Sequence, residues 1–273
     1  MKPIYQQKII ASGLFAVLLA SLSPGAARAA DTIFVTNNDS GTNTVGAYTT
    51  SGATLNAALI SDVTGPWGIA VAGSVLFVVN RGANTIGEYA TSGATVNAAL
   101  IKGLSEPAFI ALSGGNLFVT NESAGTIGEY TAFGETVNAA LISGLFAPEG
   151  IALSGGDLFV ANGDGTIGEY TTSGMTVNAA LISGLIGPSG IAVSGSDLFV
   201  TDLQAGTIGE YTTSGETVNA ALISGLDLPA GIAISDGVGS SVPEASTWVM
   251  ALTGFAAPGF AGIRRARSRP VSA

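Results

Sequence analysis

Residues 126–131 read Thr-Ile-Gly-Glu-Tyr-Thr, and close copies of this stretch return at regular intervals along the chain. The tyrosine of the stretch recurs with spacings of 41, 41, 40 and 41 residues. Self-similarity with a period of about 40 residues is typical of the blades of a β-propeller. We therefore interpret the body of the chain as five units of one fold. The recurring tyrosines are Tyr48, Tyr89, Tyr130, Tyr170 and Tyr211.

Each unit contains four short stretches with the composition of β-strands. In one unit these are residues 109–112, 117–121, 126–131 and 136–142, which are rich in apolar, β-branched or aromatic side chains. Turns that contain glycine separate most of them, as in antiparallel strands with tight connections. A helix over residues 138–142 is an alternative, because alanine and leucine favour helices, but so short a helix is marginal in water. The pattern favours an all-β propeller of four-stranded blades.

The two ends of the repeat region complement each other. The first unit begins at residues 33–37, which match the second strand of the other units, so this unit lacks a first strand. The region ends with residues 231–235, which match a first strand and have no second strand after them. We predict that these N- and C-terminal strands pair. Such pairing would close a five-bladed propeller and cover its exposed sheet edges.

The repeat resembles the NHL-type propeller repeat. The resemblance rests on runs such as Pro66-Trp67-Gly68-Ile69-Ala70-Val71, followed by Leu76-Phe77-Val78-Val79-Asn80, and it covers residues 33–235. Alanine or serine stands where that family often places aspartate after the first strand. The resemblance implies a propeller fold. It implies no single function, because this fold serves in binding, in scaffolding and in several enzymes.

The two ends of the chain have the composition of targeting segments. Residues 1–29 carry Lys2 and Lys8 around the start of an apolar run, and Ala-Arg-Ala at 27–29 offers small residues for cleavage. This arrangement predicts a secretory signal peptide, with an uncleaved N-terminal anchor as the alternative. We expect the five-repeat propeller over residues 31–236, a linker with a sorting motif at 237–247, a hydrophobic helix at 248–263 and a basic tail at 264–273.

The C-terminal tail resembles the PEP-CTERM sorting signal of Gram-negative bacteria. It begins with Val242, Pro243 and Glu244 and ends in a cluster that includes Arg264 and Arg265, although Ala245 stands where the family usually has proline. The resemblance implies an exosortase-type transpeptidase as a partner and transient membrane anchoring through the hydrophobic helix. It also implies export across the inner membrane to the cell surface or the extracellular space. A plain C-terminal membrane anchor is the alternative, although the apolar stretch is short for a span.

Charge and composition exclude several functional classes. The net charge is −10, and Arg81 and Lys102 are the only basic residues between positions 31 and 240. So acidic a surface repels phosphate, which excludes nucleic acid as a partner. The chain has no histidine and no cysteine, so it lacks the commonest general base, imidazole metal ligands and a disulfide framework. We therefore expect no catalytic residue, no cofactor and no metal site.

Two sets of polar residues recur once per unit. An asparagine or aspartate ends each second strand and would form a polar ring at one channel mouth, with hydrogen bonds to the following turn as the alternative role. A glutamate recurs in the third strand of four units, and we expect a solvated band there because the blades hold these carboxylates apart. The ring is Asn37, Asn80, Asn121, Asn162 and Asp202, and the band is Glu88, Glu129, Glu169 and Glu210.

The loops before the first strands vary from unit to unit. Variation on a constant scaffold is typical of positions that set binding specificity. Exposed aromatic side chains stack on sugars or partner proteins, and packing between blades is the alternative role for the tryptophan. The ligand-binding candidates are Trp67, Arg81, Phe109, Phe146 and Glu149.

These observations lead us to predict an exported, non-enzymatic surface or matrix protein. Its propeller would bind a polysaccharide or another envelope component, because the chain has two targeting segments and neither histidine nor cysteine. The alternative is a propeller enzyme of lyase or lactonase type that acts in the channel mouth. A passive spacer without a ligand is a third interpretation.

Overall fold

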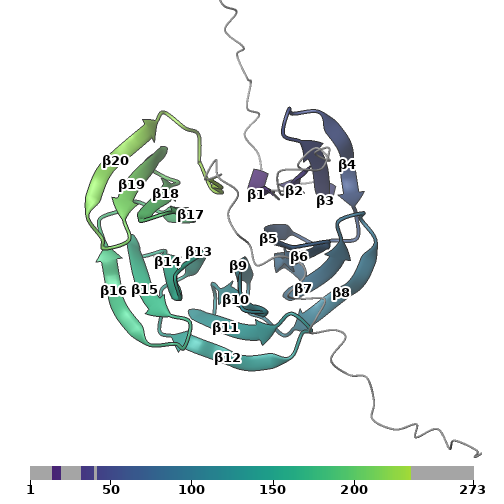
Figure 1. The fold of residues 1–273 in the computed structure, drawn as a ribbon, viewed down its shortest axis with the longest axis horizontal. Coiled ribbons are helices and arrows are strands. Elements are labelled where there is room, and N and C mark those ends of the chain that lie inside the picture. The colour runs from purple at the N-terminus through teal and green to yellow at the C-terminus, as the bar shows by residue number, and fades with distance from the viewer. Residues whose placement is uncertain (1–13, 20–31, 40–41, 235–273) are drawn as a thin grey trace, which may run out of the picture. The chain divides into compact units, whose positions relative to one another are not determined.

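Five four-stranded antiparallel sheets make up the described fold (Figure 1). The computed structural model describes residues 14–19, 32–39 and 42–234. A single turn of 3-10 helix, η1, spans Arg81–Ala83. The strands are β1 (Leu14–Leu19), β2 (Thr32–Asp39), β3 (Thr42–Thr49), β4 (Thr54–Ile60), β5 (Pro66–Ala72), β6 (Val75–Asn80), β7 (Thr85–Ala90), β8 (Thr95–Lys102), β9 (Pro107–Ser113), β10 (Asn116–Asn121), β11 (Thr126–Thr131), β12 (Thr136–Ser143), β13 (Pro148–Ser154), β14 (Asp157–Asn162), β15 (Thr166–Thr171), β16 (Thr176–Ile182), β17 (Pro188–Ser194), β18 (Asp197–Asp202), β19 (Thr207–Thr212) and β20 (Thr217–Ser224).

The sheets are the blades of a propeller, and we number them 1 to 5 in chain order. Each blade is formed by four consecutive strands that pair in sequence, from β1–β4 in blade 1 to β17–β20 in blade 5. The innermost strands β1, β5, β9, β13 and β17 contact one another in that order. The predicted five-bladed propeller of four-stranded blades is confirmed. Residues 138–142 lie within strand β12, so the strand assignment is correct there.

The hydrophobic core lies between successive blades. Successive side chains of a strand point to opposite faces of the sheet. On β6, Leu76 and Val78 therefore join the cluster shared with blade 1, whereas Phe77 and Val79 join the cluster shared with blade 3. This division repeats from blade to blade, and it explains why the second strands are apolar on both faces.

The Gly-x-Tyr motif is a packing device. The Tyr89 side chain is fully buried, and its ring folds back over the backbone of Gly87. A Cβ atom on Gly87 would lie 2.5 Å from Cε2 of Tyr89, well inside van der Waals contact. The motif therefore needs glycine for space. The same close approach recurs at Gly46, Gly128, Gly168 and Gly209.

The outermost strand of each blade is exposed and carries a kink at an asparagine. In β12 the Oδ1 atom of Asn138 accepts the backbone N–H of Ala140 at 3.1 Å. The pairing of β12 with β11 shifts register beside this residue, between Ile127 and Glu129 and again between Glu129 and Tyr130. The outer edge of every blade is thus bent at an equivalent position. The corresponding asparagines are Asn56, Asn97, Asn178 and Asn219.

Closure of the propeller differs from the prediction. Strand β2 pairs with β1, with Leu19 opposite Ile33 and Leu14 opposite Asn37. Residues 231–234, which we expected to pair with β2, form no strand. Both segments are apolar, but β1 directly precedes β2 in the chain. Pairing it closes a much shorter loop, which costs less conformational entropy.

The predicted end segments fall largely outside the described residues. The chain has two compact units, Met1–Gly239, which contains the propeller, and Ser240–Ala273. The sorting-signal residues Val242, Pro243, Glu244, Arg264 and Arg265 lie outside the described part of the chain, as does the expected helix at 248–263. Within residues 14–19, 32–39 and 42–234, no helix has the length and apolar character to cross a membrane.

Candidate functional site

One end of the propeller carries two kinds of connection from every blade. Strands alternate in direction, so the turn from second to third strand lies at the same end as the loop from a fourth strand to the next blade. The N–H of Arg81, in the turn of blade 2, donates to the carbonyl of Gly65 in the preceding loop at 3.0 Å. We call this end the loop face. It comprises the loops at 61–65, 103–106, 144–147 and 183–187 and the turns at 81–84, 122–125, 163–165 and 203–206.

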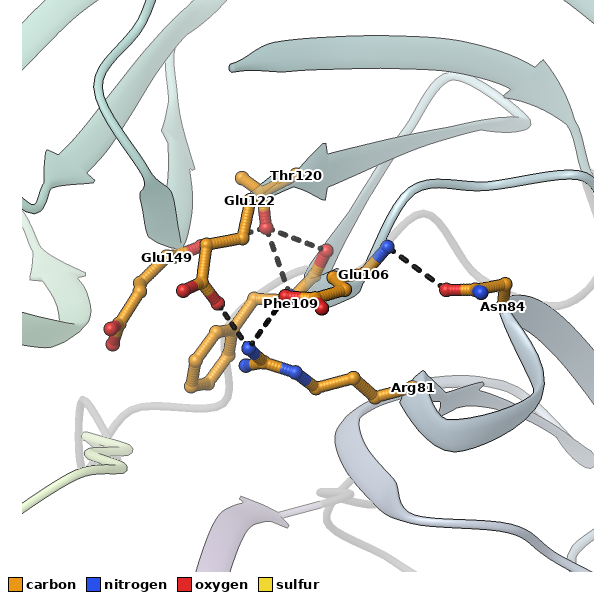
Figure 2. A network of polar contacts seen from close by, with 7 residues as sticks. All are labelled: Arg81, Asn84, Glu106, Phe109, Thr120, Glu122 and Glu149. Atoms are coloured by element: carbon orange, nitrogen blue, oxygen red, sulfur yellow. Dashed lines mark hydrogen bonds and ion pairs between the residues drawn. The ribbon is translucent and has the colours of Figure 1, made fainter. Parts of the chain in front are cut away.

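Arg81 is the centre of a charged cluster on the loop face (Figure 2). Its Nη2 atom lies 2.5 Å from Oε2 of Glu122 and 3.4 Å from Oε2 of Glu106. Its Cζ atom lies 4.8 Å from the ring centroid of Trp67, within the range of a cation–π contact. The side chains of Arg81 and Glu122 are 23% and 24% exposed, whereas that of Glu106 is 54% exposed. The pair with Glu122 is therefore the shielded one. We call Trp67, Arg81, Glu106 and Glu122 the arginine cluster.

The backbone around Glu106 is held in an unusual conformation. Glu106 has a φ of 48° and Asn84 a φ of 56°, both in the left-handed region. Asparagine tolerates this region, whereas glutamate adopts it at a cost of about 1 kcal/mol or more. The Oδ1 atom of Asn84 accepts the N–H of Glu106 at 2.9 Å, and the Glu106 carbonyl accepts the N–H of Glu122 at 3.1 Å. These bonds fix the loop beside Arg81.

Glu149 approaches the arginine cluster from blade 4 (Figure 2). It is the second residue of β13, and its carbonyl accepts the hydroxyl of Thr120 at 2.7 Å. The same hydroxyl oxygen accepts the N–H of Phe109 at 2.9 Å. Thr120 is fully buried. One threonine of β10 thus positions the start of two neighbouring innermost strands, β9 and β13.

The carboxyl group of Glu149 has a perturbed acidity. Its pKa is raised above 4.5, mainly because burial removes water from the carboxylate, with a smaller contribution from the charge of Glu122. A hydrogen bond from Ser189 and the charge of Arg81 act in the opposite direction. A half-buried carboxyl with a raised pKa is suited to accept and return a proton.

A cavity of about 540 Å³ opens beside the cluster. It is lined by Trp67, Arg81, Asn84, Glu106 and neighbouring residues, and Glu149 is not part of its lining. This volume is in the usual range for small-molecule sites. The cavity can hold a ligand against the indole and guanidinium groups.

The structure places the five predicted ligand-binding residues on neighbouring blades. Trp67 and Arg81 are in cation–π contact, and the backbones of Phe109 and Glu149 both bond Thr120, whereas Phe146 is 65% exposed on the next loop. In blades 2, 4 and 5 the position of Phe109 is glycine, namely Gly68, Gly150 and Gly190. The aromatic side chain is thus a feature of blade 3 alone.

The predicted polar ring lies at the ends of the second strands and bonds inward to the protein. Asn121 accepts the N–H of Ser105 at 3.3 Å, and Asp202 accepts that of Ile186 at 2.7 Å. The amide groups of Asn37 and Asn162 donate to threonine hydroxyls, and that of Asn80 donates to Tyr89. These contacts connect each second strand to the adjoining loop or to the third strand of its own blade.

The glutamate band stays dispersed. Burial raises the pKa of Glu88 and of Glu169, but these residues lie in different blades. Glu129 accepts a hydrogen bond from Asn116 at 2.6 Å. In the described parts of the chain, no three acidic side chains are grouped as metal ligands would be.

Two residues of the cluster were missed as site candidates. Glu106 belongs to one of the variable loops before the first strands, and Glu122 lies in the turn after the second strand of blade 3. A signal for Glu122 was present, because it directly follows Asn121 as Arg81 follows Asn80. Residues of opposite charge at one repeat position in adjacent blades can meet across the blade boundary.

Comparison with known families identifies the relationship of the chain. The model of the virginiamycin B lyase family matches residues 25–245. The chain belongs to the virginiamycin B lyase family. No curated protein matches it.

Solved structures share the propeller fold of the virginiamycin B lyase family. A streptogramin B lyase is 24% identical with a TM-score of 0.63, over 80% of this chain and 72% of that chain. A catalytically inactive virginiamycin B lyase from Staphylococcus aureus, with quinupristin, is 23% identical with a TM-score of 0.62, over 81% and 73%. A chain of the nidogen–laminin complex is 18% identical with a TM-score of 0.63, over 73% and 79%. At these identities the likeness shows the fold alone.

Membership of the virginiamycin B lyase family overturns one prediction. We expected a protein without enzymatic activity, because histidine and cysteine are absent. The family match points instead to a lyase-type enzyme. The inference failed because it equated acid–base chemistry with imidazole, whereas a carboxyl group in a desolvated site can do the same work.

Proposed function

We propose that this chain is a lyase that acts on the loop face, with Glu149 as the acid–base group and Arg81 as the electrostatic group. The observation that carries the proposal is the raised pKa of Glu149 beside a fixed guanidinium group, in a chain of a lyase family. The cavity at Trp67 and Arg81 would receive part of the substrate, and the reacting carbon would lie beyond the edge of the cavity, at the Glu149 carboxyl.

The chemistry proposed is an elimination. The Glu149 carboxylate removes a proton from the carbon next to a carbonyl group, a carbon–carbon double bond forms, and the bond to the leaving oxygen breaks. The same carboxyl group then returns the proton to that oxygen, so no water is consumed. Arg81 stabilises the negative charge that develops on the carbonyl oxygen. Phe109 and Trp67 would limit the access of water to the reacting groups.

A carboxylate base would set this chain apart from a structural relative. The inactive Staphylococcus aureus enzyme carries alanine in place of a histidine. The present chain contains no histidine. Its general base must therefore be another group, and Glu149 is a carboxyl near Arg81 whose pKa is raised by burial.

Quinupristin, which is bound in that relative, is the first probe of the reaction. Mass spectrometry distinguishes the chemistries, because elimination within a ring leaves the mass unchanged whereas hydrolysis adds one water. We expect Glu149→Gln to lower kcat by about 100-fold or more, the usual contribution of a general base. Glu169→Gln, which removes another glutamate with a raised pKa, should leave kcat unchanged. Equal losses in both variants, a hydrolysed product, or no conversion by the wild-type chain would contradict the proposal.

We also propose that the chain is exported and processed at both ends. The leader at residues 1–29 and the tail from Val242 to Arg265 support this, the latter through its likeness to signals used by exosortase-type transpeptidases. The enzyme would then work at the cell surface or outside the cell, near envelope polysaccharide. The Pro-x-Gly-Ile-Ala runs separately support the proposal that the blades are of the NHL type. Mass spectrometry of both termini of the exported protein tests the processing. Arg264→Ala/Arg265→Ala should retain the tail, and an intact leader or an unchanged tail would contradict the proposal.

A further inference from the structure

The innermost place of blade 1 is served by two segments of the chain. In the other blades one segment makes both contacts of an innermost strand, namely the ladder with its own second strand and a side contact with the preceding blade. In blade 1, β1 makes the ladder with β2. The side contact with blade 5 is made by residues 229–234, which we call the closing segment.

The side contact of the closing segment equals that of a true innermost strand. The hydroxyl of Thr201 donates to the carbonyl of Ala230 at 3.1 Å. The equivalent bond joins Thr120 to Glu149 at the boundary of blades 3 and 4. Ala230 is 6% exposed, so the closing segment is buried at the residue that makes this hydrogen bond.

A glycine of blade 5 is adapted to this contact. A Cβ atom on Gly190 would collide with the carbonyl of Ala230. A Cβ atom on Gly150 would collide in the same way with the carbonyl of Ser189, in the next innermost strand. Gly190 thus needs to lack a side chain because the closing segment packs against it, just as Gly150 does because β17 packs against it. The closing segment therefore occupies the position of the next innermost strand of the ring.

The sequence of the closing segment supports the same assignment. Residues 229–234 read Pro-Ala-Gly-Ile-Ala-Ile, and residues 188–193 of β17 read Pro-Ser-Gly-Ile-Ala-Val. Residues 14–19 of β1 read Leu-Phe-Ala-Val-Leu-Leu and lack the Pro-x-Gly start. The segment that matches the repeat is therefore docked beside blade 5, while a segment that does not match it holds the ladder.

We propose that β1 is a temporary occupant and that the closing segment replaces it on β2 once β1 is withdrawn. Withdrawal would leave backbone groups from Ile33 to Asn37 without partners, which is costly. The closing segment is already anchored to blade 5 by Thr201, so its effective concentration at β2 is high. By analogy with β17 and β18, Pro229 would lie opposite Asn37, Ile232 opposite Val35, and residue 235 opposite Thr32.

Removal of the leader is the natural trigger, and in this respect the inference rests on the processing proposed above. The precursor and the processed protein would then be closed by different strands. The leader would act as a placeholder that keeps the edge of β2 covered, since exposed strand edges invite pairing with other chains. After cleavage the ring would be closed by the two ends of the mature domain.

Cysteine pairs test the exchange, because the chain has no cysteine of its own. Thr32→Cys/Ser235→Cys reports closure, and Ser194→Cys/Asp197→Cys, a pair that lies opposite in blade 5, is the matched control. Directly opposite residues are close enough for a disulfide. In the full chain under oxidised glutathione, we expect the control pair to link and the closure pair to link weakly.

Leu18→Pro, which removes a backbone donor in β1 and disfavours the strand, should raise the linked fraction of the closure pair several-fold, towards that of the control. No rise while the control still links, or full linking before β1 is disturbed, would overturn the proposal. The exported protein with the same pair, its N-terminus mapped by mass spectrometry, repeats the test without proline. A missing link in protein without its leader also overturns the exchange, whereas an uncleaved leader refutes only the processing.

Discussion

Replacing Thr120 with valine should show whether its buried hydroxyl both stabilises the fold and positions Glu149. The Thr120 hydroxyl oxygen accepts the N–H of Phe109 at 2.9 Å, and the hydroxyl donates to the carbonyl of Glu149 at 2.7 Å. Val79 occupies the same strand position in blade 2 and is fully buried there, so valine fits this environment. Thr120→Val therefore removes hydrogen bonds without a large change in shape.

The expected cost follows from the groups left without a partner. An unsatisfied buried donor or acceptor costs about 1–3 kcal/mol. Taking about 2 kcal/mol for Thr120→Val, and about 2–4 °C per kcal/mol for a domain of this size, Tm should fall by about 4–8 °C. Thr201→Val is the matched control. Its hydroxyl is equally buried and bonds Gly190 at 2.7 Å and Ala230 at 3.1 Å, in blade 5 and away from the arginine cluster.

Thermal and urea unfolding, together with kcat and KM for quinupristin, measure both roles. Both variants should lose similar stability, but only Thr120→Val should lower kcat and change the pH profile, because only this threonine holds the backbone of Glu149. Thr120 is thus a positioning residue. If Thr120→Val costs less than about 0.5 kcal/mol, or if the two variants reduce kcat equally, the reasoning from this hydrogen bond is refuted.

Three further predictions concern the cluster and the core. Glu122→Gln should lower the free energy of unfolding by about 1–3 kcal/mol, because it breaks the shielded ion pair with Arg81. Glu106→Gln, at a side chain that is 54% exposed, should change the free energy of unfolding by less than about 0.5 kcal/mol. Urea unfolding measures both, and equal costs would contradict the difference in shielding. The pKa of Glu149 is raised in the folded state, so this group binds its proton more tightly there than in the unfolded chain, and stability should fall as pH rises from 4.5 through the raised pKa. The difference between wild type and Glu149→Gln in urea unfolding at stepped pH should show this loss, and parallel curves would refute it. Gly87→Ala should lower the free energy of unfolding by about 1–3 kcal/mol, because the added methyl group overpacks against the Tyr89 ring. In a Tyr89→Leu background the same substitution should cost much less in thermal unfolding. An equal cost in both backgrounds would show that the ring is not the cause.

The sequence was sufficient for the blade and insufficient for the closure. The same local sequence features recur in the blades, so one sequence shows them repeatedly. Examples from blade 2 are the glycine that makes room for Tyr89 and the apolar residues on both faces of β6. Closure occurs once, and it depends on which of two apolar segments reaches β2. Residues 14–19 and 231–235 are both largely apolar, and the shorter chain connection of residues 14–19 to β2 outweighs the better match of residues 231–235 to the repeat.

The candidate site was predictable where it departs from the repeat. Trp67, Arg81 and Glu149 attracted notice because they vary at fixed positions of the unit. The approach of Glu122 to Arg81 depends on the distance between two neighbouring blades, which no local pattern encodes. The acidity of Glu149 depends on burial and on Ser189, two blades of the fold acting together. Because the pKa of a carboxyl depends on such surroundings, the absence of histidine did not justify the prediction of a protein without enzymatic activity.

The kinked outer strands bear on the tendency of the propeller rim to pair with other chains. Their sequences, such as Thr-Val-Asn-Ala-Ala-Leu-Ile at 136–142, are nearly uncharged, and Lys102 is the only charged residue in any of them. An uncharged, straight perimeter would offer five templates on which strands of other molecules could grow into fibrils. The asparagine bends each template so that a straight strand cannot follow it. The five backbone kinks thus hinder strand pairing with other molecules at the outer edges, a task for which other sheet proteins use charged side chains such as lysine.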